Sequence, residues 1–132
     1  MKYEVSKLGN NKYSTGNFKK GFDATRGWFV GDFFPDSHAN KTRDVEIMYK
    51  KHTKGDIVVP HYHKEKVEVL IVLSGKMEFT VNGEKNILNK DDFIFTDKNN
   101  VNSLLVLEDS EILAIHSPSL PKDKYLVDPA NR

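Results

Sequence analysis

The sequence predicts an all-β protein with one domain, arranged as an antiparallel sandwich or barrel. Apolar and polar residues alternate with a period of two along several short segments, which is typical of half-buried strands. Turn-forming residues separate these segments at short intervals, and no segment has a convincing helical period. A chain of 132 residues is long enough to bury one core of its own.

The first third of the chain combines a polar arm with the first expected strands. Residues 1–25 are polar and rich in Asn, Lys and Gly, so we expect an N-terminal arm there. Residues 27–34, GWFVGDFF, are aromatic and β-branched, as strands often are. A polar loop over 35–44 precedes DVEIMYKK at 44–51, whose alternation predicts a half-buried strand.

Short strands and turns alternate from residue 55 onward. VEVLIVLS at 67–74 leads into Gly75, and KMEFTV at 76–81 leads into Asn82-Gly83, the best hairpin signal in the chain. The remaining strands are expected at 85–88, 93–96, 101–107 and 111–117. The predicted division of the chain is an arm over 1–25, a barrel over 26–118 and a C-terminal tail over 119–132 that wraps the outside.

Composition argues against several classes of function. The formal net charge is +1, so no electrostatic footprint indicates nucleic acid or an anionic membrane as a partner. The chain has no cysteine, which removes disulfides, zinc–thiolate sites and thiol nucleophiles. No apolar leader or membrane-spanning run is present, so we expect a cytoplasmic protein.

A pair of histidines near the middle of the chain is the main indication of chemistry. His61 and His63 share a face if their segment is extended, because side chains alternate along a strand. The intervening KEK predicts a turn that brings Glu68 back beside the two imidazoles. Two imidazoles and a carboxylate suit Fe(II), Mn, Ni or Zn. Spacing alone also fits a pair on the solvent-exposed surface.

The same segment resembles the first motif of the cupins. Gly55, His61, His63, Glu68 and Gly75 match that motif at every defined position and spacing. The resemblance implies a small antiparallel β-barrel or jelly roll. It also implies that His61, His63 and Glu68 hold a metal inside the barrel. The strand rhythm extends the likeness from about residue 45 to residue 117.

The second cupin motif is degenerate in this chain. Asp91-Asp92 takes the place of a Gly-Asp pair, and DKNN at 97–100 takes the place of a Pro-Gly turn. Asn102 falls where the resemblance places the fourth metal ligand, a histidine. An amide oxygen is a weaker ligand than imidazole, but Asn102 can also hold a water or a substrate hydroxyl. Two states are open: a metal site with three strong ligands, or a metal-free pocket with a histidine dyad.

The residues around this site have mostly structural interpretations. Leu70 and Val72 are expected to share the face of Glu68, and Tyr62 to point away from the histidines. Trp28 and Tyr49 are interpreted as core residues near the mouth of the pocket. His116 ends the last strand, where it can either approach the pocket or pack against the tail, and we favour packing. His38 and His52 are interpreted as surface residues in polar loops.

Three classes of function are compatible with the sequence. The first is an enzyme acting on a small polar or sugar-like molecule, either as a metal-dependent oxygenase, isomerase or lyase, or with His61 or His63 as a general acid or base. The second is a ligand-binding or sensing module with a metal-free site. The third is a structural subunit. The aromatic segment 27–34 predicts a homodimer in any of these cases.

Overall fold

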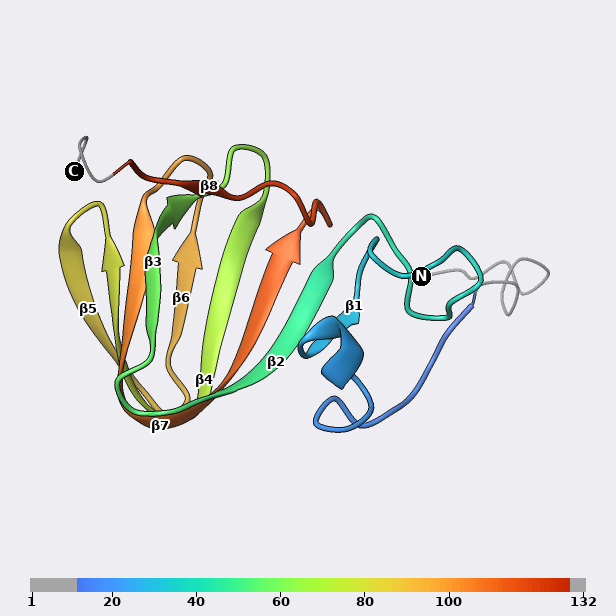
Figure 1. Ribbon diagram of the computed structural model, residues 1–132, viewed down its shortest axis with the longest axis horizontal. Coiled ribbons are helices and arrows are strands. Elements are labelled where there is room, and N and C mark those ends of the chain that lie inside the picture. Colours follow the sequence, from blue (N-terminus) through green and yellow to red (C-terminus); the bar gives the residue numbers. More distant parts are fainter. Residues whose placement is uncertain (1–11, 129–132) are drawn as a thin grey trace, which may run out of the picture.

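The computed structural model describes residues 12–128, and these residues form antiparallel strands around one core (Figure 1). A short 3-10 turn, η2, spans Asp23–Thr25. The strands are β1 (Trp28–Val30), β2 (Glu46–His52), β3 (Ile57–Tyr62), β4 (Val67–Val81), β5 (Glu84–Asn89), β6 (Phe93–Thr96), β7 (Asn102–Ser117) and β8 (Tyr125–Leu126). The prediction of an all-β chain is confirmed.

The two long strands β4 and β7 organise the fold, because they pair with each other along most of their length. The first half of β4 also pairs with β6, and the end of β7 pairs with β2, which pairs with β1. The first layer therefore contains β1, β2, β6, the first half of β4 and the end of β7. The second layer contains β5, the second half of β4, the start of β7, β3 and β8. The continuous sheet thus folds into two facing layers, as in a jelly roll.

The expected breaks at Gly75 and at residues 108–110 are bends within strands rather than turns between them. Residues 67–74 and 76–81 belong to the single strand β4, and 101–107 and 111–117 belong almost entirely to β7. β4 and β7 bend together and continue to pair, with register shifts between Val72 and Met77. The Asn82-Gly83 pair does join β4 to β5 as predicted, with both residues at positive φ.

The core lies between the two layers. Its buried members come from both inner faces and are Leu70, Val72, Met77, Phe79, Leu88, Leu104, Val106 and Ile112. Val72 and Met77 are fully buried. Leu70 and Val72 share the inner face with Glu68, as expected from strand alternation.

Part of the aromatic N-terminal segment lines the central cavity, through Trp28 and Phe33, and the rest packs outside it. Only Trp28–Val30 of the predicted strand 27–34 enters the sheet. Phe33 and Phe34 instead contact each other, with ring centroids 4.7 Å apart. Phe18 packs on Tyr49, with centroids 5.2 Å apart. Tyr49 is therefore buried on the outer side of β2 and does not line the central cavity.

The two histidines predicted at the surface have different environments. His52 is the last residue of β2 and is buried, with Nδ1 3.2 Å from Oδ2 of Asp56. The interpretation of His52 as a surface loop residue was wrong, because β2 continues one residue beyond Lys51, where the predicted strand ends. His38 is half-buried and stacks on Phe34 with a centroid distance of 3.9 Å.

Within residues 12–128, no helix has the length and apolar character required to cross a membrane. The cytoplasmic location stays a prediction.

Candidate functional site

A cavity of about 580 Å³ lies between the two layers, which is a typical volume for a small-molecule site. Its walls are mainly apolar side chains from the core. Its polar lining includes His61, His63, Glu68 and Asn102. The four residues that the sequence predicted as a site therefore line one cavity.

One polar row crosses the inner face of the first layer. Glu46 of β2 lies opposite His116 of β7, which lies opposite Glu68 of β4, and Thr96 of β6 completes the row. Residues directly opposite one another in a sheet share a face. All four side chains therefore point inward, and all four residues are buried. The next inner row, which includes Ala114 and Leu70, is apolar.

The C-terminal segment holds the loop between His63 and Glu68 in place. The Asp123 carboxylate accepts hydrogen bonds from the backbone N–H groups of residues 64, 65 and 66, each at 2.9 Å. The predicted KEK turn is therefore present, and its shape depends on a residue from the tail. In Figure 1 this tail crosses the end of the barrel, where β8 runs beside β3.

The two histidines of the motif have the same hydrogen-bonding pattern. Nδ1 of His61 donates to the carbonyl of Val59 at 2.8 Å, and Nδ1 of His63 donates to the carbonyl of Asp123 at 2.5 Å. Each ring therefore carries its neutral-state proton on Nδ1 and leaves the lone pair of Nε2 free. Nε2 of His63 is buried and has no hydrogen-bond partner among the described residues.

A local irregularity in β3 turns His61 inward. Val58 pairs with Leu104 and His61 pairs with Asn102, so both of these β3 residues face the interior although they are three positions apart. The register shift between them accommodates the extra residue. Tyr62 points away from the cavity, as predicted, and stacks on Tyr125 at 5.5 Å.

His116 is the site residue to which the sequence interpretation gave a structural role in preference to a place in the pocket. Its Nδ1 lies 3.0 Å from Oε1 of Glu46, and its Nε2 lies 2.5 Å from Oε1 of Glu68. It lines the cavity and does not simply pack against the tail, as we had expected. The available indication was periodicity, because Ile112, Ala114 and His116 must share the inner face of one strand.

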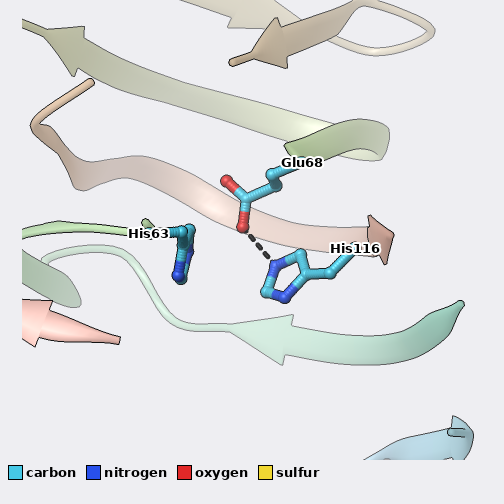
Figure 2. A group of neighbouring side chains, drawn as sticks. All are labelled: His63, Glu68 and His116. Atoms are coloured by element: carbon cyan, nitrogen blue, oxygen red, sulfur yellow. Dashed lines mark hydrogen bonds and ion pairs between the residues drawn. The ribbon is translucent and has the colours of Figure 1, made fainter. Parts of the chain in front are cut away.

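Three side chains converge closely enough to hold one metal ion. The ligand atoms of His63, Glu68 and His116 lie within 4.8 Å of one another. Figure 2 shows the carboxylate of Glu68 between the two imidazoles. His61 lies just outside this group, with its ring centroid 5.3 Å from that of His63. Asn102 lines the same cavity, and its buried Nδ2 has no partner among the described residues.

The charges of this polar region are internally balanced. Lys66 is buried and forms an ion pair with Glu46, and Ser119 donates to the same carboxylate at 3.1 Å. His116 bridges Glu46 and Glu68. Two carboxylates thus face one ammonium and one imidazole. Such a buried set requires its partners, because removing one leaves an uncompensated charge.

The histidine pKa values move in opposite directions within the cavity. Burial lowers the pKa of His61, and the positive charge of Lys124 acts in the same direction. Burial also lowers the pKa of His63. Burial alone would lower the pKa of His116 as well, but its hydrogen bonds to Glu46 and Glu68 outweigh that effect and raise it. Burial therefore disfavours a proton on His61 and His63, whereas the two carboxylates favour one on His116.

The donor set fits a divalent transition metal. Histidine ligands in metal sites commonly donate the second ring N–H to a carbonyl or a carboxylate. His61 and His63 donate to backbone carbonyls, and Nδ1 of His116 faces Glu46. The unpartnered Nε2 of His63 is the most direct sign, because a buried polar atom without a partner is costly. Imidazole and carboxylate ligands suit Fe(II), Mn, Ni and Zn.

A jelly-roll barrel with an inward-facing cluster of imidazoles and carboxylates defines a class of small β-barrel proteins with an interior site. The chain matches a family model described as the cupin domain over residues 48–113, which is half of the 132 residues. It therefore belongs to the cupin family. No curated protein sequence matches the chain.

Solved structures provide further similarities. KdgF from Halomonas sp. is 26% identical, with a TM-score of 0.58 over 61% of this chain and 74% of that chain. A predicted oxalate decarboxylase from Thermotoga maritima is 28% identical, with a TM-score of 0.50 over 56% of this chain and 64% of that one. Pac13, a nucleoside dehydratase, is 16% identical, with a TM-score of 0.59 over 65% and 70% of the two chains, and supports the fold alone.

Proposed function

We propose that the protein is a metal-dependent cupin enzyme that acts on a small polar molecule inside the barrel. The observation that carries this proposal is the buried, unpartnered Nε2 of His63 beside Glu68 and His116. Membership of the cupin family and similarity to a predicted oxalate decarboxylase support a small-molecule activity.

The proposed metal ligands are His61, His63, Glu68 and His116. Three of them are the ligands that the first motif implies, and His116 supplies an imidazole where Asn102 offers only an amide. A divalent ion held by these residues supplies a Lewis acid for isomerisation or lyase chemistry, or, as Fe(II), a centre for oxygen-dependent chemistry. Because Glu46 and Glu68 raise the pKa of His116 and so favour a proton on it, metal binding there competes with that proton.

The other cavity residues orient the substrate and exclude water. The free Nδ2 of Asn102 is a hydrogen-bond donor available to a substrate oxygen. Leu70, Phe79, Leu104 and Ile112 form apolar walls that bury the body of a ligand. Glu46 holds Nδ1 of His116, so it positions that ring.

The metal proposal is tested by elemental analysis of protein purified without a chelator and without a histidine tag. We expect one equivalent of a transition metal, and loss of zinc or nickel binding in His63→Ala and Glu68→Gln. His38→Ala is the matched control, because it removes an imidazole that stacks on Phe34 outside the cavity. Wild-type protein that neither contains nor binds a transition metal would contradict the proposal.

A metal-free binding module is the alternative function. One observation favours it: Glu68 and His116 already satisfy each other through a hydrogen bond. In that case His61 and His63, both neutral, serve as hydrogen-bond acceptors or as a general base at Nε2. A ligand that co-purifies with metal-free protein and dissociates from His61→Ala would favour this function.

We also propose that the protein forms a homodimer. The aromatic segment that suggested this is largely packed within one chain, so the support now comes from another surface. The outer face of the first layer carries Val69, Ile71, Phe93, Phe95, Leu113 and Ile115 in opposing pairs. Phe93 is 67% exposed and Phe95 54%. An apolar patch can pack against the same patch of a second copy, as a symmetric dimer requires.

A further inference from the structure

The positive and negative side chains that line the cavity do not cancel as a whole, although those of the buried polar row do. The cations that line it are Arg26, Lys50, Lys66 and Lys124, and the acids are Glu46 and Glu68. Lys66 forms an ion pair with Glu46, and His116 bridges the two acids. No acidic side chain lining the cavity remains without a partner within the described chain.

The other three cations have no ion-pair partner among residues 12–128. Arg26, Lys50 and Lys124 form none of the salt bridges found there, and all three are solvent-exposed. The cavity therefore presents three free positive charges and no free negative charge, although the whole chain has a net charge of only +1.

These cations come from opposite walls of the cavity. Arg26 follows η2 at a positive φ of 55°, and Lys50 lies on β2, which belongs to the first layer. Lys124 directly precedes β8, which pairs with β3 of the second layer beside His61. A ligand entering between the layers meets positive charge on both sides. Such an arrangement raises the local concentration of anions and speeds their association.

We propose that the substrate of this site is a small organic anion, bearing a carboxylate that Arg26, Lys50 and Lys124 attract and hold at the cavity mouth. This assignment rests on the proposed function, because it names the substrate class of the same site. The apolar walls receive the body of the molecule. A second polar group, at the end opposite the carboxylate, reaches Asn102 and the histidines.

Isosteric pairs of compounds test the role of charge directly. The probes are benzoate and benzamide, succinate and succinamide, and glucuronate and glucuronamide, each titrated at millimolar concentration and followed by NMR shifts of the protein. We expect the acid of at least one pair to bind about tenfold more tightly than its amide. That preference should shrink as NaCl rises from about 20 mM to about 300 mM. Inorganic phosphate, titrated in parallel, shows whether a carboxylate is preferred over another anion.

The variant Arg26→Gln, Lys50→Gln, Lys124→Gln should abolish the preference for acids. The matched control is Lys54→Gln, Lys90→Gln, Lys98→Gln, which removes the same charge from exposed lysines outside the cavity. All titrations are run on protein stripped with a chelator and again with zinc. A preference without metal supports the inference even where zinc fails to bind, and zinc binding without a preference overturns the inference alone. The inference is also overturned if no acid binds, or if phosphate binds more tightly than every acid. It is overturned as well if the control variant loses the preference for acids to the same extent.

Discussion

At the scale of single residues, the candidate site depends on which histidine ring nitrogens already form hydrogen bonds. His61 and His63 each use Nδ1 on a backbone carbonyl, which leaves Nε2 for the cavity. His116 uses both nitrogens on carboxylates. The three histidines therefore differ in their tendency to bind a proton although they line one cavity, because burial lowers the pKa of His61 and His63 and hydrogen-bond partners raise that of His116.

Asn102→His should strengthen metal binding. Asn102 is buried, pairs with His61 across β3 and β7, and has an unused amide N–H. An imidazole there adds a strong ligand, so we expect zinc or nickel affinity to rise about tenfold or more, which is roughly 1.4 kcal/mol. Ser103→His is the control, because the neighbouring residue points to the opposite face of the strand. Calorimetric titration measures both, and equal affinities in the two variants would contradict the metal site.

The stability supplied by His116 should depend on pH in the metal-free protein. Its folded pKa is raised above the unfolded value of about 6.5. Its contribution is therefore fully present below about pH 6.5 and is lost as pH rises through the folded pKa. We expect His116→Gln to cost roughly 3 kcal/mol at about pH 6 and clearly less at about pH 9. Urea unfolding in a chelator measures this, and a cost independent of pH would show that the charge is not involved.

At the scale of elements, the motif residues Gly55 and Gly75 have different structural roles. Both adopt a positive φ, 94° and 91°. A Cβ on Gly55 would meet nothing within 4 Å, whereas a Cβ on Gly75 would lie 2.2 Å from Oγ of Ser110 and 2.3 Å from the carbonyl oxygen of Asp109. Gly75 therefore allows β4 and β7 to approach where both strands bend.

Gly75→Ala should destabilise the protein much more than Gly55→Ala. The positive φ costs each variant about 1–2 kcal/mol, and the contact with β7 adds roughly 1–3 kcal/mol for Gly75→Ala alone. Thermal and urea unfolding of the two variants measure the difference. Similar losses of stability would mean that glycine is required at position 75 for its backbone conformation and not for the close packing of the bend.

The segment before β8 is expected to position the site. Asp123 accepts three backbone N–H groups of the loop that joins His63 to Glu68. Asp123→Ala leaves those donors unpaired and should cost roughly 1–3 kcal/mol. It should also weaken metal binding about 10–100-fold, as the loss of a supporting contact does. Lys122→Ala, at an exposed neighbouring position, is the control, and unchanged metal affinity in Asp123→Ala would remove this role.

At the scale of the whole molecule, the two faces of the first layer differ in what covers them. The inner face is covered by the second layer. On the outer face, Phe18 covers Tyr49, but Phe93 and Phe95 are left exposed. Antiparallel sheets usually present a polar face to water, so exposed aromatic residues on β6 indicate an interface.

Light scattering should find a dimer at high protein concentration. Phe93→Lys combined with Phe95→Lys should convert it to a monomer, because charges would then oppose each other across the symmetric contact. Ile57→Lys is the control, since Ile57 is equally exposed but lies on the outer face of the second layer. A monomeric wild-type protein, or a dimer that persists in the double variant, would contradict this interface.

The sequence by itself determined the strand periodicity, the Asn-Gly hairpin and the local motif from Gly55 to Gly75. These features depend on neighbouring residues, through side-chain alternation and turn chemistry. The same local information predicted that His61, His63 and Glu68 lie together, and the resemblance to the cupins added Asn102. All four residues line one cavity.

Only the tertiary structure decided which distant residues complete that cavity. His116 meets Glu46 and Glu68 because β7 pairs with β2 on one side and β4 on the other. Asp123 reaches the loop at 64–66 because the tail returns alongside β3. Such contacts depend on strand register, and a shift of one residue turns every side chain to the opposite face. Register between distant strands is set by the packing of the whole barrel, so no local pattern in the sequence specifies it.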